Sequence, residues 1–98
     1  MNTVTRSIFR AIHEGKWLSI EYRNQQTQLT KYWIAIKSLD PKARTLTVDG
    51  LHLGLLTVQE LDRIHIDRVQ TAEVVDGSWC AVNQSLVDDI RENPGRYA

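Results

Sequence analysis

The apolar residues at the start of the chain recur at helical spacing: Val4, Ile8, Ala11 and Ile12. They fall at i, i+4, i+7 and i+8 and therefore share one side of a helix of about three turns. Gly15 favours the left-handed conformation that closes a helix, and Thr3 or Thr5 is expected to supply the N-cap oxygen. The pattern predicts one amphipathic helix that ends at Gly15.

After Gly15 the spacing changes to two, which is typical of half-buried strands. It predicts strands over residues 16–23, 29–39 and 44–50. Asn24-Gln25-Gln26 suits a hairpin turn between the first two strands, and Asp40-Pro41-Lys42-Ala43 has the composition of a turn before the third. Asp49-Gly50 signals a further turn.

The following part of the chain is less regular. Residues 51–62 fit neither period, and we expect an irregular connection in which Leu56 and Val58 are buried in the core. Residues 63–77 predict one long strand, or two strands joined at a bend.

A short helix is predicted near the end of the chain. Ser85, followed three residues later by Asp88, resembles a capping box, and Leu86 and Ile90 lie one turn apart before Pro94-Gly95. Consecutive strands joined by short turns are antiparallel, and a small bent sheet protects its edges by curling. We therefore predict a mainly β (α+β) fold, a strongly bent five-stranded antiparallel barrel with an N-terminal and a short C-terminal helix.

The composition indicates a single domain over residues 1–98, because 98 residues with 42% hydrophobic content cannot form two independent cores. Twelve Lys and Arg balance twelve Asp and Glu, so no long-range attraction to a polyanion is expected. The distribution is uneven. Through Asp49 there are eight basic and four acidic residues, and the proportions are reversed in the remainder, so one face could be basic.

The lone Cys80 excludes an internal disulfide and indicates a reducing compartment, so we expect a cytoplasmic location. No stretch approaches the roughly 20 apolar residues that span a bilayer. The chain starts with Met1 and stops soon after the predicted last helix, at Ala98. We therefore expect it to be the N-terminal part of a longer protein.

Two segments carry a family resemblance. "IFRAIHEGKWLSIEYRNQQ", residues 8–26, has a short helix ending in Ala-Ile, a few polar residues and an apolar strand closed by Tyr-Arg. "IHIDRVQTAEV", residues 64–74, has an apolar residue followed by Asp, Arg and Val on a strand. These segments resemble the start and the closing strand of the bacterial WYL domain. The name-giving Trp-Tyr-Leu triplet is absent, and the corresponding strand reads Thr45-Leu46-Thr47-Val48, unless Tyr32-Trp33-Ile34 is a displaced remnant of the triplet.

The resemblance implies an Sm-like barrel with an N-terminal helix. It also implies a regulatory or nucleic-acid-sensing module of a larger bacterial protein, either a transcription factor or, for a module at the N-terminus, a helicase-like ATPase. The remainder of that parent chain is then an expected partner. The missing triplet weakens the case for small-ligand sensing.

Arg68 and Asp67 are the first candidate site residues. An arginine on the last strand can present its planar guanidinium to phosphate, and a neighbouring carboxylate can hold it in place. The alternative is a structural ion pair across strands.

A second candidate group lies in the basic half of the chain: Arg23, Lys31, Lys37 and Arg44. Trp33 lies between Lys31 and Lys37, so bases could stack on the indole while the cations follow the phosphates. The alternative is a solvated face whose Trp33 packs against the opening helix.

Four other aromatic residues are expected in the core or at its edge: Trp17, Tyr22, Tyr32 and Trp79. We expect Trp79 to pack against the last helix. Cys80 is interpreted as a small buried apolar residue, not as a nucleophile.

The chain has no motif for catalysis, for a cofactor or for a metal. His13, His52, His65 and Cys80 lack the paired spacing of metal ligands, and no phosphate-binding loop or nucleophile motif is present. From the uneven charge and the family resemblance we predict a non-catalytic nucleic-acid-binding or regulatory module, with single-stranded or duplex DNA as the expected partner. If the parent hydrolyses ATP, that site lies beyond Ala98. The alternatives are a protein-interaction module that docks through a barrel edge, or a small-ligand sensor of a transcription factor.

Overall fold

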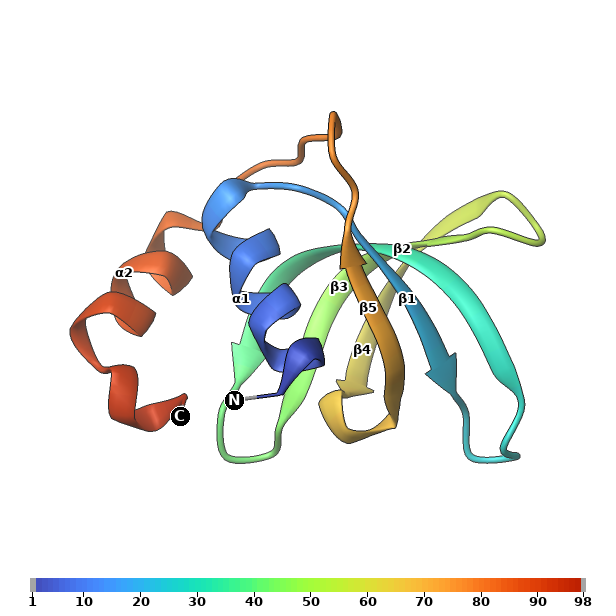
Figure 1. The fold of residues 1–98 in the computed structure, drawn as a ribbon, viewed down its shortest axis with the longest axis horizontal. Helices are drawn as coiled ribbons and strands as arrows, with labels where there is room; N and C mark the ends of the chain where they lie inside the picture. Colours follow the sequence, from blue (N-terminus) through green and yellow to red (C-terminus); the bar gives the residue numbers. More distant parts are fainter. Residues whose placement is uncertain (1, 98) are drawn as a thin grey trace.

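A computed structural model describes residues 2–97 as a strongly curved antiparallel sheet flanked by helices (Figure 1). The strand order is β4-β3-β2-β1-β5. The mixed α+β fold, rich in strand, is confirmed, but β4 and β5 form no ladder with each other within residues 2–97, so the sheet stays open. The elements are α1 (Thr3–Glu14), β1 (Leu18–Arg23), β2 (Leu29–Asp40), β3 (Thr45–His52), β4 (Thr57–His65), the 3₁₀ turn η1 (Ile66–Arg68), β5 (Val69–Val74), α2 (Gln84–Glu92) and the 3₁₀ turn η2 (Pro94–Arg96).

The caps of α1 are partly as predicted. Gly15 has φ of 65° and its amide donates to the carbonyl of Ala11, which confirms the left-handed end. The N-cap is Asn2, not Thr3 or Thr5, because the Asn2 Oδ1 accepts the Thr5 amide at 2.8 Å. The helix therefore begins one residue earlier than a Thr3 cap would give and three residues earlier than a Thr5 cap would give.

The first two predicted turns are confirmed, and each is held by one side chain. Asn24 Oδ1 accepts the amides of Gln26 and Gln28 in the β1–β2 hairpin. Asp40 Oδ1 accepts the two amides that follow Pro41 between β2 and β3.

The predicted turn at Asp49-Gly50 is wrong, because both residues lie inside β3. Gly50 pairs with Ile34 and Gln59, and a Cβ on Gly50 would lie 2.6 Å from a methyl group of Leu61. The glycine therefore leaves room for the Leu61 side chain across the strands and does not form a turn.

The predicted irregular connection over residues 51–62 is also wrong. The chain forms a β3–β4 hairpin whose tip spans residues 53–56, with Leu56 at a φ of 55°. Leu56 and Val58, expected in the core, are 75% and 64% exposed. Val58 faces outward because it shares a face with Leu51 and Trp33 on the side of the sheet opposite the core.

For residues 63–77, the alternative of two strands joined at a bend is confirmed. The bend is η1, and it joins the two edge strands of the sheet. In a flat sheet, four strand spacings of about 4.8 Å would separate these edges by about 19 Å. The link from His65 to Val69 reaches at most about 14 Å. The sheet must therefore curl, and shifts of register in three strand pairs, between Glu21 and Tyr22 among others, help it to bend.

A side chain bridges the curled sheet near this link. Tyr22 Oη accepts the amide of His65 at 3.1 Å, which connects β1 to the last residue of β4. Tyr22 and Tyr32 both pack against the core cluster, as predicted for them. Trp17 is partly buried, in agreement with a place at the edge of the core.

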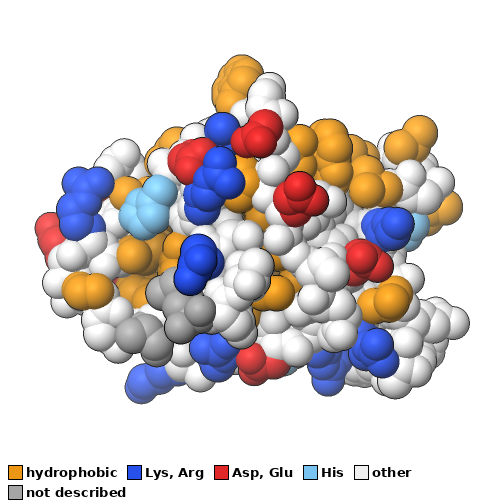
Figure 2. Space-filling view, in the orientation of Figure 1, with side chains coloured by type: hydrophobic (Ala, Val, Ile, Leu, Met, Phe, Trp, Pro, Cys, Tyr) orange, Lys and Arg blue, Asp and Glu red, His pale blue; other side chains and the backbone are white. Residues whose placement is uncertain are grey.

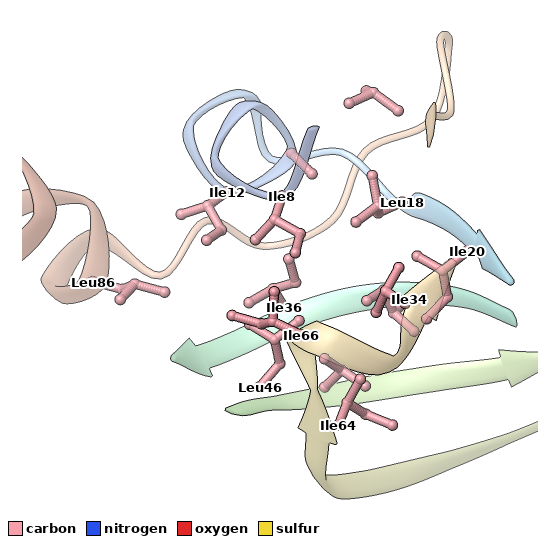
Figure 3. Close-up of a cluster of buried hydrophobic side chains, with 14 of the residues drawn as sticks. Ile8, Ile12, Leu18, Ile20, Ile34, Ile36, Leu46, Ile64, Ile66 and Leu86 are labelled. Atoms are coloured by element: carbon pink, nitrogen blue, oxygen red, sulfur yellow. The ribbon is translucent and has the colours of Figure 1, made fainter. Parts of the chain in front are cut away.

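The core lies between α1 and the concave face of the sheet. Figure 3 shows Ile8 and Ile12 of α1 directed toward Ile34 and Ile36 of β2, with Leu86 of α2 approaching from the side. Six side chains are almost fully buried: Ile8, Leu18, Ile20, Ile34, Leu46 and Val48. Within residues 2–97 no polar or charged residue is fully buried.

The last helix begins differently from the prediction. Asn83, not Ser85, is the N-cap, and its Oδ1 accepts the Leu86 amide at 3.1 Å. Leu86 is buried and Ile90 packs against the core, as the spacing predicted. The Asn83 amide group also donates to the carbonyl of Lys37, which anchors the start of α2 to β2.

Trp79 does not pack against α2, because its side chain is 81% exposed. It lies in the β5–α2 connection, whose backbone is held on both sides of Trp79. Ser78 Oγ accepts the Trp17 amide at 3.2 Å, and the Cys80 amide donates to the carbonyl of Gly15 at 2.7 Å. Across residues 2–97, no helix has the length and hydrophobicity required to cross a membrane.

We predict that Tyr22→Phe lowers the free energy of unfolding by about 1 kcal/mol, because the His65 amide loses its acceptor. This corresponds to a fall of roughly 4–8 °C in Tm for a domain of this size. Tyr32→Phe is the matched control, since the Tyr32 hydroxyl makes no hydrogen bond with another residue of the described chain. Thermal melts followed by circular dichroism measure both. Equal melting temperatures for the two variants would contradict the bridge.

Candidate functional site

The structure divides the predicted site residues between two places. Arg23 ends β1, Arg44 lies in the β2–β3 turn and Arg68 lies in η1. Figure 1 shows these segments along the bottom of the molecule, with η1 between the β1–β2 and β2–β3 turns, which lie at opposite ends of β2. We call this region, residues 23–28, 40–44 and 66–68, the basic end. Trp33 and the two predicted lysines lie on the outer, convex face of the sheet.

The pairing of the strands brings the three arginines to the basic end. Tyr22 pairs with Val69, so Arg23 and Arg68 leave neighbouring strands at the same end. The carbonyl of Arg44 accepts the amide of Ile66 at 3.0 Å, which joins the β2–β3 turn to η1. The basic end has four cations and two carboxylates, a net charge of +2, and Figure 2 shows Lys and Arg side chains along the lower edge of the molecule.

Asp67 pairs with Arg44 and not with its neighbour Arg68. The Asp67 Oδ1 lies 3.2 Å from both Nε and Nη2 of Arg44. The two side chains are 72% and 44% exposed, so this pair adds little to stability. The alternative to phosphate binding, a structural ion pair between segments, is thus present, but Asp67 forms it with Arg44 and not with Arg68. Arg68 makes no ion pair with any other residue between 2 and 97.

Lys37 is neutralised by two carboxylates. Its Nζ lies 2.5 Å from Glu60 Oε2 and 3.7 Å from Asp49 Oδ1. The hydrogen bond to Glu60, supported by the charge of Asp49, raises the pKa of Lys37 above its ordinary value. Its charge is therefore already balanced by the protein.

Lys31 and Trp33 also lie among acidic neighbours. Lys31 faces Glu21 across β1–β2, and both line a groove of about 320 Å³ with Glu73. Trp33 lies opposite Ser19 and Leu51 on the outer face, so the expected packing against the opening helix is wrong.

Six charged residues surround Trp33 and the two lysines on the outer face, two cations and four carboxylates with a summed charge of −2: Lys31, Lys37, Glu21, Asp49, Glu60 and Glu73. The structure does not give Trp33 two free cations as neighbours. A phosphate backbone would be repelled from this face.

Two cations near the basic end were not selected from the sequence. Lys42 lies in the β2–β3 turn, and with Arg96 of η2 it lines a hollow of about 420 Å³ around Pro41. Arg96 also pairs with Asp89 at 3.3 Å. Lys42 could have been selected from the sequence, because it lies two residues from Arg44 in the predicted turn. Arg96 could not, because only the tertiary fold brings it near Pro41.

Residues 2–97 have neither an activated thiol nor a cluster of metal ligands. Burial raises the pKa of the Cys80 thiol, which favours the unreactive neutral form. Within residues 2–97, no three His, Cys, Asp or Glu side chains gather in an arrangement that could hold a metal ion.

Comparison with known protein families and with curated proteins finds no match to this chain. The resemblance of residues 8–26 and 64–74 to the WYL domain therefore stays a prediction. These two segments include β1 and β5, which are paired in the sheet.

We predict that Asp67→Asn strengthens binding to a polyanion by freeing Arg44, while the free energy of unfolding changes by less than about 1 kcal/mol. The salt concentration that elutes the protein from heparin measures the first effect, and urea denaturation measures the second. Glu73→Gln is the control, because it changes the net charge equally but lies on the outer face. If both variants elute at the same salt concentration, the arginines of the basic end have no special role.

Proposed function

We propose that this chain is a non-catalytic, WYL-like module of a larger bacterial DNA-processing protein, and that it binds nucleic-acid phosphates through its basic end. One observation carries the proposal. Arg23, Arg44 and Arg68 come from three separate segments that lie along one edge of a chain whose net charge is zero, with η1 between the other two. A local positive field on a neutral protein favours phosphate contact at that end alone.

The topology supports an Sm-like barrel as the parent architecture. The strand order 4-3-2-1-5, with a three-residue 3₁₀ turn between the two edge strands, curls the sheet toward closure. The helix in front of β1 corresponds to the N-terminal helix that the WYL resemblance implies. We place the module in the cytoplasm on the basis of its single cysteine, and in a parent such as a helicase-like ATPase whose catalytic site lies outside this chain.

The proposed mechanism is recognition of the backbone without reading of sequence. An arginine guanidinium donates paired hydrogen bonds to phosphate oxygens, and Arg68 has no carboxylate partner between residues 2 and 97 to displace first. Three such contacts give a slope of log affinity against log salt of roughly −2 to −3. The module would thus position DNA for the parent protein.

A second candidate function, docking of another protein, is favoured by a different observation. Leu55, Leu56 and Val58 are 70%, 75% and 64% exposed on the hairpin that ends in the edge strand β4. An exposed edge next to apolar side chains is a surface that other chains can pair with.

The test is fluorescence anisotropy of labelled single-stranded and duplex DNA, titrated with the protein at several salt concentrations. We predict that Arg44→Gln together with Arg68→Gln weakens binding at least about tenfold and makes the salt slope shallower by about 2. Lys31→Gln together with Lys37→Gln removes the same charge from the outer face and should change affinity less than about twofold.

An equal or larger loss for the lysine pair would contradict the basic end as the binding surface. Absence of any binding at low salt would contradict nucleic-acid recognition by this chain. The same titrations show whether the protein prefers single-stranded or duplex DNA.

A further inference from the structure

An apolar row crosses three strands on the outer face of the sheet. Trp33 of β2 pairs with Leu51 of β3, and Leu51 pairs with Val58 of β4, so the three side chains lie side by side. Val58 is 64% exposed, and the other two are partly exposed. We call these three residues the outer row.

Further apolar surface adjoins the outer row on two sides. At one side, beyond the Lys37–Asp49 pair that also lines it, Trp17, Ala35 and Val82 form the apolar part of a shallow hollow of about 360 Å³ between the sheet and the segment before α2. At the other, the hairpin tip exposes Leu55 and Leu56. Figure 2 shows hydrophobic side chains gathered along the upper right of the molecule, over the sheet and the β3–β4 hairpin. A contiguous apolar surface of this kind marks an interaction site more often than scattered exposed residues do.

Carboxylates border this surface on both sides. The strand positions next to the outer row carry Asp49 and Glu60, and the strands beyond Trp33 carry Glu21 and Glu73. Lys37 offsets the first pair and Lys31 offsets the second only in part, because each lysine faces two carboxylates. The surface is therefore an apolar strip between two acidic borders.

This charge pattern indicates which kind of partner the outer face can bind. A second copy of the chain would bring the same carboxylates face to face, and like charges across an interface are unfavourable. A nucleic acid would be repelled for the same reason. A segment with apolar side chains flanked by Lys or Arg would pack on the apolar strip and pair with the carboxylates at its borders.

We propose that the outer face of β2, β3 and β4 docks a basic amphipathic segment of another protein. The apolar side chains of that segment pack on the outer row, and its cations lie against Glu60 and Asp49 on one border and Glu21 and Glu73 on the other. This site is separate from the basic end and does not depend on whether that end binds DNA.

The test uses two fluorescein-labelled peptides of about 18 residues, long enough to form a helix on binding. One has leucines on one face and lysines on the other, and its counterpart has glutamates in place of the lysines. We expect the lysine peptide to bind with saturation in anisotropy titrations, and the glutamate peptide to bind at least about tenfold more weakly.

Variants then locate the binding site. Leu51→Ser with Val58→Ser should weaken binding of the lysine peptide at least about tenfold, because it removes two of the three apolar contacts. Leu29→Ser is the matched control, since Leu29 is 51% exposed but lies at the start of β2, outside the outer row. Glu60→Gln with Glu73→Gln leaves the apolar surface intact and should weaken binding several-fold, so the proposal stays testable if the serine variant does not fold.

Three results would overturn the proposal. The first is equal affinity for the two peptides. The second is an equal loss of affinity for Leu29→Ser and for the serine pair on the outer row. The third is a stable dimer in sedimentation that Val58→Ser dissociates, because the occupant is then a second copy. Failure of DNA binding in the arginine variants bears only on the basic end, so the two proposals fail independently.

Discussion

The three-residue link between β4 and β5 is the constraint on which the rest of the fold depends. These strands form opposite edges of the sheet, yet only η1 separates them along the chain. A flat sheet would place them farther apart than the link can reach, so the sheet curls and its concave face encloses the core. The core side chains of α1, Ile8 and Ile12, then cover the part of that face left open. The Tyr22 hydroxyl holds the curled end by bonding the His65 amide.

The same constraint separates the two surfaces of the molecule. Along the edge that η1 closes, Arg23 and Arg68 lie at the paired ends of β1 and β5, and Arg44 lies beside η1 through the hydrogen bond of its carbonyl with the Ile66 amide. The β3–β4 hairpin is paired at its base, where His52 faces Thr57, but its tip extends away from the sheet and exposes Leu55 and Leu56. A chain with zero net charge thus presents a basic end and, on the convex side, an apolar strip bordered by carboxylates. Each surface suits a partner that the other would repel.

The sequence predicted what is decided by neighbours along the chain. The first helix, the first hairpin and the Asp40-Pro41 turn depend on local spacing and turn chemistry, and they agree with the structure. Gly50 was misread as a turn residue because its role, leaving room for Leu61, exists only after three strands have paired. In the candidate site, the spacing of Lys31, Trp33 and Lys37 was real, but the carboxylates around them come from β1, β3, β4 and β5. No pattern within β2 could have revealed them.

The most direct test of DNA binding at the basic end is a series of NMR spectra of the ¹⁵N-labelled protein, recorded during addition of a short DNA oligonucleotide. We predict that amide shifts cluster in residues 23–28, 40–44 and 66–68, at the basic end, and that the Trp33 and Lys37 amide signals do not shift. Shifts centred on Trp33 and Lys37 would contradict it, because they would place DNA on the acidic outer face.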